Sequence, residues 1–277
     1  MNKWIAIILP IISVLAIGVL VLGVIFFRET NKLNDAQAEI VTLESNISSL
    51  EAKVSTLEAD LAATEVEASA LEAELLATFP DANLEIAIRE ALGKPQGPIY
   101  KSALEAVTTL EALGLEFFGL ISDLTGLEYC TNLEGLNLGE NDINDISPLT
   151  GLTTLQELSL WGNDISDISA LAGLTNLQEL SLYSNNVSDI SSLAGLTTLQ
   201  GLNLAENNIS DISSLVGLTA LMEIYLQDNN ISDISPLVAN SGLSAGDIVN
   251  LSGNPLSTTS VDVYIPQLEE RGVNIIY

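Results

Sequence analysis

The sequence predicts an α/β solenoid, in which short strands stack side by side into one sheet. The main observation is a 22-residue pattern, L-x-x-L-x-L-x-x-N-x-I-S-D-I-S-x-L-x-G-L-T-x, that occurs five times in succession over residues 133–242. One such unit cannot bury its apolar side alone, whereas stacked units form one continuous core. The copies begin at Leu133, Leu155, Leu177, Leu199 and Leu221.

Within each unit, the segment L-x-x-L-x-L predicts a strand whose leucines point inward while the residues between them face out. An asparagine follows each strand, and we expect its side chain to satisfy backbone groups of the turn. The I-S pair that comes next predicts a tight turn or a short 3₁₀ segment on the convex side. This arrangement is a leucine-rich repeat horseshoe with a parallel β-sheet on its concave face. The asparagines are residues 141, 163, 185, 207 and 229.

Both ends of the repeats carry segments that would shield the outermost leucines. Residues 79–132 predict a helical N-terminal cap and an irregular first repeat, with Asp81 as N-cap and Gly93 as helix stop. Aligning Leu110 with Leu133 gives that first repeat 23 residues, one more than the others. Residues 243–277 predict a terminal repeat, with three extra residues before Val249, and a C-terminal cap.

Two motifs resemble the internalin type of leucine-rich repeat protein. One is the repeat segment I-S-D-I-S-P-L, closest in Ile143–Leu149 and Ile231–Leu237, and the other is the cap Phe79-Pro-Asp-Ala-Asn-Leu84 with Leu92-Gly93-Lys94. The resemblance covers residues 79–255 and implies a surface adhesion module that binds a host or neighbouring protein on its concave face. This chain differs in its N-terminal anchor, and residues 256–277 hold neither an Ig-like domain nor a wall-sorting signal.

The N-terminus predicts a single-pass membrane anchor after a tail of residues 1–3. Residues 4–27 carry no charge, and 24 residues at ~1.5 Å each can cross a ~30 Å hydrocarbon core. The stretch is longer than the apolar region of a signal peptide and ends in Phe27-Arg28 without a cleavage site. We therefore expect a signal-anchor in the cell membrane with the acidic C-terminal domain outside, although flanking Lys and Arg are nearly balanced.

Residues 28–78 predict a coiled-coil stalk, since apolar residues recur with a seven-residue period and neither Gly nor Pro interrupts them. Ile and Val at a with Leu at d favour a parallel homodimer through residues 33–78. A basic heteromeric partner is the alternative, because the e and g positions are mostly acidic. The a positions are Leu33, Ile40, Ile47, Val54, Leu61, Ala68 and Leu75, and the d positions are Ala36, Leu43, Leu50, Leu57, Thr64 and Leu71.

The chain of 277 residues has a formal charge of −29, and Ser102–Glu270 contains 23 acidic residues without one Lys or Arg. This excludes nucleic acid as a ligand of the solenoid, because binding it requires positive charge. The acidity suits a basic protein partner, divalent cations or simple solubility. We expect the repeating aspartates to hold turns rather than calcium, and we expect no cofactor. These are Asp145, Asp167, Asp189, Asp211 and Asp233.

The composition argues against an enzyme. Histidine is absent and Cys130 is the single cysteine, so histidine-dependent triads, zinc clusters and internal disulfides are unavailable. No P-loop or dinucleotide-binding turn occurs. We expect Cys130 to be a small buried residue.

The outward residues of the concave strands are the predicted binding site. Trp161 and Tyr183 should be neighbours on strands ~4.8 Å apart, with acidic residues beside them, as in a protein-binding hot spot. The alternatives are ordinary packing of these rings, an oligomeric envelope scaffold driven by the stalk, and carbohydrate binding. The predicted residues are Glu157, Ser159, Trp161, Glu179, Ser181, Tyr183, Asn203, Glu223, Tyr225 and Gln227.

Overall fold

The structure is a computed structural model that describes residues 8, 11–20, 33–114 and 119–277. The chain divides into two compact units, Met1–Ala73 and Glu74–Tyr277. Within the predicted anchor, residues 8 and 11–20 are helical, and the rest of residues 4–27 lies outside the described residues. Among the helices that are described, none combines the length and the apolarity that crossing a membrane requires. The membrane anchor therefore stays a prediction.

The predicted stalk, residues 28–78, is helical over most of its length. Helix α2 runs without interruption over 43 residues, Leu33–Leu75. Residues 28–32 lie outside the described residues, and Leu76 forms an isolated bridge with Tyr100 instead of continuing the helix. Many apolar side chains of α2 are open to solvent, with exposed fractions of 59% at Leu50 and 66% at Leu57. The pairing of this helix in a coiled coil stays a prediction.

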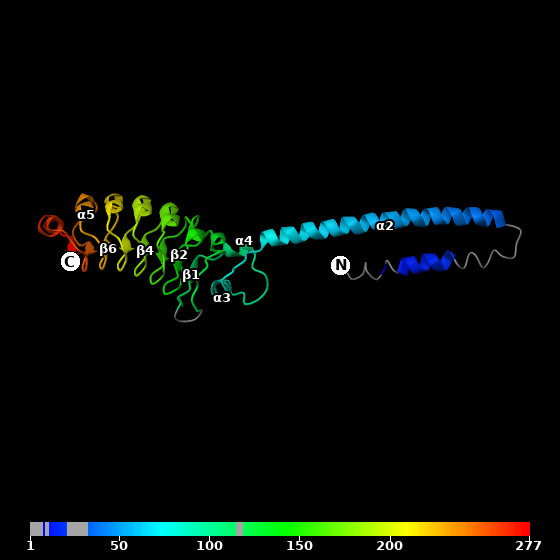
Figure 1. Cartoon of the computed structure of the whole chain (residues 1–277), viewed down its shortest axis with the longest axis horizontal. Coiled ribbons are helices and arrows are strands. Elements are labelled where there is room, and N and C mark those ends of the chain that lie inside the picture. The colour runs from blue at the N-terminus through cyan, green and yellow to red at the C-terminus, as the bar shows by residue number, and fades with distance from the viewer. Residues whose placement is uncertain (1–7, 9–10, 21–32, 115–118) are drawn as a thin grey trace. The chain divides into compact units, whose positions relative to one another are not determined.

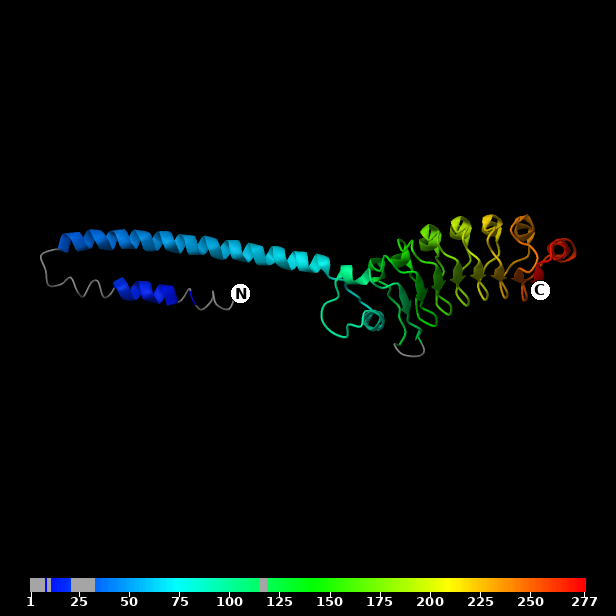
Figure 2. The same cartoon turned by 180° about the vertical axis from the view of Figure 1, so that it is seen from behind.

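The second unit contains the predicted solenoid. Its sheet has eight parallel strands in the order β1 to β8, so each strand pairs with its neighbours in sequence. Figure 1 and Figure 2 show these strands along one side of the solenoid and short helical segments along the other. The strands are β1 (Thr109–Glu111), β2 (Gly135–Asn137), β3 (Glu157–Ser159), β4 (Glu179–Ser181), β5 (Gly201–Asn203), β6 (Glu223–Tyr225), β7 (Ile248–Asn250) and β8 (Asn274–Ile276).

The middle residue of each repeat strand points into one continuous core. Leu136, Leu158, Leu180 and Leu202 pair in register across β2 to β5 and are at most 2% exposed. The two flanking residues of each strand face the other side of the sheet, as the alternation of side chains requires.

The turn residues that recur in every repeat have the structural roles that the sequence predicts. The Asn163 carboxamide donates to the carbonyl oxygens of Leu138 and Leu160 and accepts from the Ile143 N–H at 3.0 Å. Each repeating aspartate accepts from the backbone N–H two residues later, as Asp145 does from Ser147 at 2.8 Å. These bonds satisfy backbone groups that the tight turns would otherwise leave unpaired.

On the convex side, each turn leads into a short helical segment. As predicted, the first four of these that follow the regular strands are 3₁₀ helices, but the last is a turn of α-helix, α5 (Ser235–Ala239). The 3₁₀ segments are η3 (Leu127–Tyr129), η4 (Ser147–Leu149), η5 (Ser169–Gly173), η6 (Ser191–Gly195) and η7 (Ser213–Gly217).

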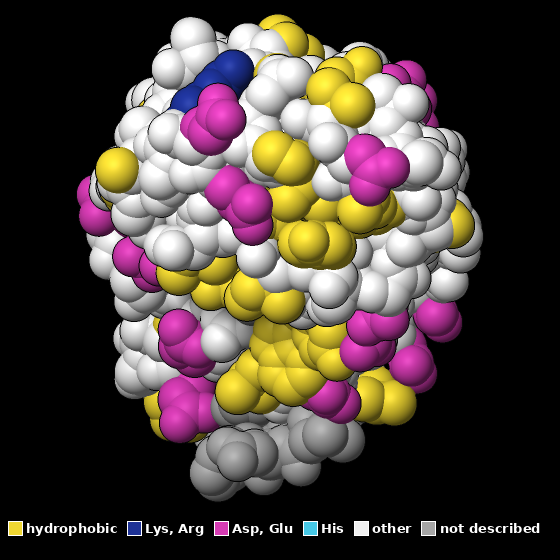
Figure 3. Space-filling view, turned by 90° about the vertical axis from the view of Figure 1, so that its left-hand side faces the viewer, with side chains coloured by type: hydrophobic (Ala, Val, Ile, Leu, Met, Phe, Trp, Pro, Cys, Tyr) yellow, Lys and Arg dark blue, Asp and Glu magenta, His cyan; other side chains and the backbone are white. Residues whose placement is uncertain are grey.

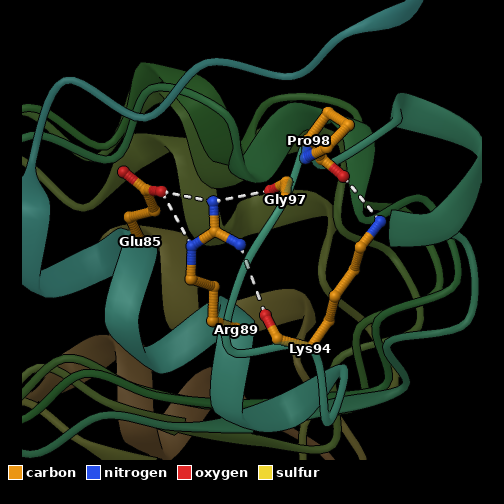
Figure 4. A network of polar contacts seen from close by, with 5 residues as sticks. All are labelled: Glu85, Arg89, Lys94, Gly97 and Pro98. Carbon is orange, nitrogen blue, oxygen red and sulfur yellow. Dashed lines mark hydrogen bonds and ion pairs between the residues drawn. The ribbon is translucent and has the colours of Figure 1, made fainter.

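The N-terminal cap consists of helix α3 (Ala82–Ala91) and the short helix α4 (Lys101–Leu104). Asp81 caps α3 by accepting from the N–H groups of residues 83 and 84, and Gly93 follows the helix with a φ of 59°. Arg89 contacts Glu85 and donates to the carbonyl oxygens of Lys94 and Gly97, which holds the loop after α3 against the helix (Figure 4).

The predicted length of the first repeat is wrong. Leu110 of β1 pairs with Leu136 of β2, not with Leu133, so 26 residues separate equivalent positions. The insertion relative to a 22-residue unit is thus four residues rather than one. The prediction aligned Leu110 with the first leucine of the strand motif, Leu133, whereas it is equivalent to the second, Leu136.

The C-terminal cap contains the π-helical turn η8 (Ser260–Tyr264), helix α6 (Ile265–Glu270) and strand β8. The three extra residues before Val249 are confirmed, since Val249 pairs with Ile224. Strand β8 itself was not predicted. Arg271 donates to the carbonyl oxygens of Val238 and Asn240 and so fixes α6 to α5. Figure 3 views this end of the solenoid and shows acidic side chains scattered among apolar surface, with Lys or Arg at one edge.

Candidate functional site

The outward-facing strand residues line a shallow groove of about 310 Å³ on the concave face. The parallel register places them in two columns, one from the first and one from the third residue of each strand. The first column is Thr109, Gly135, Glu157, Glu179, Gly201 and Glu223, and the second is Glu111, Asn137, Ser159, Ser181, Asn203 and Tyr225.

The structure brings most of the predicted site residues together. The seven that line the groove are Glu157, Ser159, Glu179, Ser181, Asn203, Glu223 and Tyr225. Trp161, Tyr183 and Gln227 lie two residues beyond their strands, in a third column that borders the concave face.

The prediction missed the contribution of the first two strands, β1 and β2. Glu111 and Asn137 also line the groove, and the Asn137 carboxamide donates to the Glu111 carboxylate at 2.9 Å. The sequence signal was the L-x-L pattern around Leu110, but the wrong alignment of the first repeat concealed the position of Glu111.

Glu179 is the groove glutamate whose pKa is shifted by its surroundings. Its carboxylate lies over Gly201, and a Cβ atom at that position would collide with it. Partial burial, and then the charges of Glu223 and Glu157, raise the pKa of Glu179 above its usual value. The groove therefore holds several carboxylates whose mutual repulsion a bound cationic group would relieve.

The two aromatic side chains beside the groove do not stack on each other. Their backbones are neighbours, since the Gly162 N–H donates to the Tyr183 carbonyl oxygen at 2.8 Å. The Trp161 indole, however, lies over Gly139 in the preceding repeat, where a Cβ atom would collide with it. The Tyr183 hydroxyl reaches the opposite way and donates to Glu206 of the following repeat at 2.8 Å. The prediction that their residues are adjacent is confirmed, but the rings lean apart.

The turn that follows each strand adds carboxylates to this border. Glu140, Glu206 and Asp228 occupy equivalent positions with φ between 53° and 58°, a left-handed conformation that is uncommon outside glycine. The hydrogen bond to Glu206, followed by the charges of Glu206, Asp228 and Glu140, raises the pKa of Tyr183. Burial and the bond to Glu223 raise that of Tyr225.

The cations of the second unit lie in its caps and not in its repeats. Lys94 donates to the Pro98 carbonyl oxygen at 2.6 Å, as Figure 4 shows, and Lys101 lies 4.6 Å from the ring centre of Tyr129. Over the residues that are described, the pair Arg89–Glu85 is the single ion pair between side chains. The groove carboxylates consequently have no internal counter-ion.

The described part of the solenoid offers neither a reactive thiol nor a group of metal ligands. Cys130 is fully buried, and burial together with the charge of Glu128 raises the pKa of its thiol to about 12. Across residues 8, 11–20, 33–114 and 119–277, no group of three acidic or Cys residues could hold a metal ion. What the concave face offers is a polar, acidic surface with an aromatic border, which suits binding.

Sequence comparison places the chain among leucine-rich repeat proteins. The family described as "Leucine Rich repeats (2 copies)" matches residues 153–195 and 197–239, and a "Leucine Rich repeat" family matches residues 129–146. A comparison with curated proteins finds no significant match.

Solved structures with the same fold include two internalins from Listeria monocytogenes. One, inlF, is 38% identical with a TM-score of 0.63, and the match covers 72% of this chain and 56% of that one. The other, internalin C2, is 33% identical with a TM-score of 0.54 and is covered over 93% of its length. The Leptospira interrogans leucine-rich repeat protein LIC12759, 22% identical with a TM-score of 0.51, shares the fold alone; the match covers 65% of this chain and 51% of that one.

Proposed function

Because this chain belongs to the internalin type of leucine-rich repeat proteins, we propose that it is a recognition protein whose concave face binds a protein partner. The leucine-rich repeat fold is a protein-interaction module. The observation that carries the proposal is the groove itself, where exposed glutamates and half-buried polar side chains from six strands converge beside Trp161 and Tyr183. Such a mixture of aromatic anchors and polar groups is typical of protein-binding surfaces.

The partner that fits this groove presents Lys or Arg next to apolar groups. Glu157, Glu179 and Glu223 lie within one column, and partial burial followed by the charges of the other two glutamates raises the pKa of Glu179. A basic side chain placed there would gain the attraction of several carboxylates and relieve their repulsion. Attraction of this kind also speeds association at low salt.

Photocrosslinking in the producing cells tests the concave site. A photoreactive residue at Ser181 faces the groove, whereas one at Ser213 on η7 faces the convex side and is the matched control. We expect a crosslinked protein from Ser181 and none from Ser213. Crosslinking from both positions alike, or from Ser213 alone, would contradict a concave binding site.

Substitution of the aromatic border provides a second test. Trp161→Ala with Tyr183→Ala should abolish the Ser181 crosslink, because both rings would be lost from the edge of the groove. Val216→Ala is the control, since Val216 is a 39% exposed apolar side chain outside the groove lining. Full retention of the crosslink in the double variant would favour the scaffold function, in which the stalk assembles the protein and the solenoid is inert. A crosslink unaffected by 0.5 M salt would favour carbohydrate or apolar recognition over a charged partner.

We further propose that residues 4–27 anchor the protein in the cell membrane and that the solenoid lies outside. The uncharged stretch of 24 residues supports this arrangement. Protease treatment of intact cells should remove a tag placed after Tyr277 and leave a cytosolic control protein intact. Protection of the tag until the envelope is opened would refute the external location.

The third element of the proposal is that α2 pairs in parallel with a second copy of the chain. A paired stalk would present two solenoids together, which raises the effective concentration of the second site once the first is occupied.

A further inference from the structure

Most large apolar side chains in the seam of α2 are open to solvent. The a and d side chains project on one side at the heptad spacing; seven of them are 36–66% exposed, and Ile40 and Ile47 are half-buried. A helix of 43 residues provides six heptads, which is ample for a stable two-stranded coiled coil. The exposed seam residues are Leu43, Leu50, Val54, Leu57, Leu61, Leu71 and Leu75.

The one hydroxyl in the seam can be buried without an unpaired donor. Thr64 occupies a d position, and its hydroxyl donates to the carbonyl oxygens of Asp60 and Leu61 at 2.8 and 2.9 Å. Because the donor is already used within its own helix, covering Thr64 with a second helix leaves no donor unsatisfied. The seam can therefore pair over its full length.

The charges that flank the seam oppose this pairing. In a parallel pair, the g residue of one helix meets the e′ residue five positions later on the other. Three such pairs join two carboxylates, and one pair, Lys53 with Glu58, joins opposite charges. Two-fold symmetry doubles each of them. The repulsive pairs are Glu39–Glu44, Asp60–Glu65 and Glu67–Glu72.

The apolar residues of the seam favour a parallel pair over an antiparallel one. Ile40, Ile47 and Val54 occupy a positions and leucines occupy most d positions, a combination that favours parallel two-stranded coiled coils. A second copy in parallel is thus the occupant that the seam favours among self-pairings.

We propose that the charge on these flanking carboxylates sets the strength of the parallel pair, so that salt tightens it. The inference rests on the proposed dimer of α2. Salt screens the repulsion between g and e′ carboxylates. Lys53 is the one opposing charge at these positions, and its attraction to Glu58 is weakened by the same screening.

Disulfide formation first tests whether the pair exists. In the full chain, Leu57→Cys places a thiol at a d position, where a parallel in-register pair brings it next to its symmetry mate. Ala59→Cys, at an outward f position, is the matched control, and Cys130 does not interfere because it is buried. Ready oxidation of the Leu57→Cys variant alone supports the pair. Failure of that disulfide, or equal oxidation of both variants, would overturn the dimer itself.

Sedimentation of the full chain in detergent then tests the effect of charge. From 50 to 500 mM NaCl at pH 7.5 we expect the dimer dissociation constant to fall about tenfold, since six screened contacts of a few tenths of a kcal/mol are involved. A dimer that forms but weakens with salt, or does not respond to it, would overturn the charge inference while leaving the dimer intact.

Charge reversal supplies the matched comparison. Glu67→Lys converts two repulsive contacts into attractive ones and should tighten the dimer about tenfold at low salt. Ala52→Lys with Ala59→Lys changes the net charge by the same amount at f positions, which point away from the seam. Equal tightening in both variants would mean that overall charge and not the e and g positions matters, and would refute the proposal.

Discussion

Replacing Asn185 with alanine should remove one of the turn asparagines whose hydrogen bonds join adjacent repeats. The Asn185 side chain is 7% exposed. It donates to the carbonyl oxygens of Leu160, Leu182 and Tyr183 and accepts from the Ile165 N–H at 3.0 Å. The side chain thereby connects two successive repeats.

The loss of stability in the Asn185→Ala variant depends on which backbone groups keep another hydrogen-bond partner. The carbonyl oxygens of Leu160 and Leu182 retain bonds from Asn163 and Asn207, and that of Tyr183 retains the Gly162 N–H. The Ile165 N–H loses the acceptor that it has in the wild type. One orphaned buried donor and three weakened acceptors correspond to about 3 kcal/mol of lost stability.

Denaturant unfolding of the full chain, followed by circular dichroism and by Trp161 fluorescence, measures this loss. Asn186→Ala is the matched control, because Asn186 is exposed and makes one long contact of 3.4 Å with Asp164. We expect the control to change stability by less than about 0.5 kcal/mol. A loss below about 1 kcal/mol for Asn185→Ala would show that the asparagine ladder is not a major source of stability.

Three further outcomes follow from the structure. The Cys130 thiol, with a pKa of about 12, should react with a thiol reagent only after unfolding, and rapid reaction of the native chain would contradict its burial. Burial alone would raise the pKa of Asp81, but hydrogen bonds from four backbone N–H groups lower it overall. The stability that wild type has over Asp81→Asn should therefore be largest above pH ~4, the pKa of the unfolded chain, and should decrease as the pH falls below it. Acid unfolding of the two proteins measures this difference. Gly139→Ala should displace the Trp161 indole into water and shift its fluorescence emission to the red, and an unchanged spectrum would refute the close packing.

The repeats were predictable because each of their positions has a strong local requirement. Leucine spacing determined the strand faces, the asparagines had to satisfy turn backbone, and Asp81 and Gly93 bounded the cap helix. The first repeat failed for the opposite reason. Its motif around Leu110 contains too few leucines to distinguish alignment with Leu133 from alignment with Leu136.

The candidate site was predictable in position but not in side-chain arrangement. Strand alternation identified which residues face the groove, and Glu157 and Ser181 lie where it placed them. The directions of the Trp161 and Tyr183 rings depend on contacts with other repeats. Gly139 leaves space for one ring and Glu206 binds the other, and neither relation can be read from a single repeat.

A perfectly regular solenoid would present the same column of side chains at every repeat, so a partner could bind it equally well in several registers. Departures from the repeat remove this ambiguity. Gly201 interrupts the glutamate column and receives the Glu179 carboxylate, and Gly139 interrupts the third column and receives the Trp161 indole. These two glycines give the concave face its individual shape, and filling either of them should alter partner selection more than removing a regularly repeated residue does.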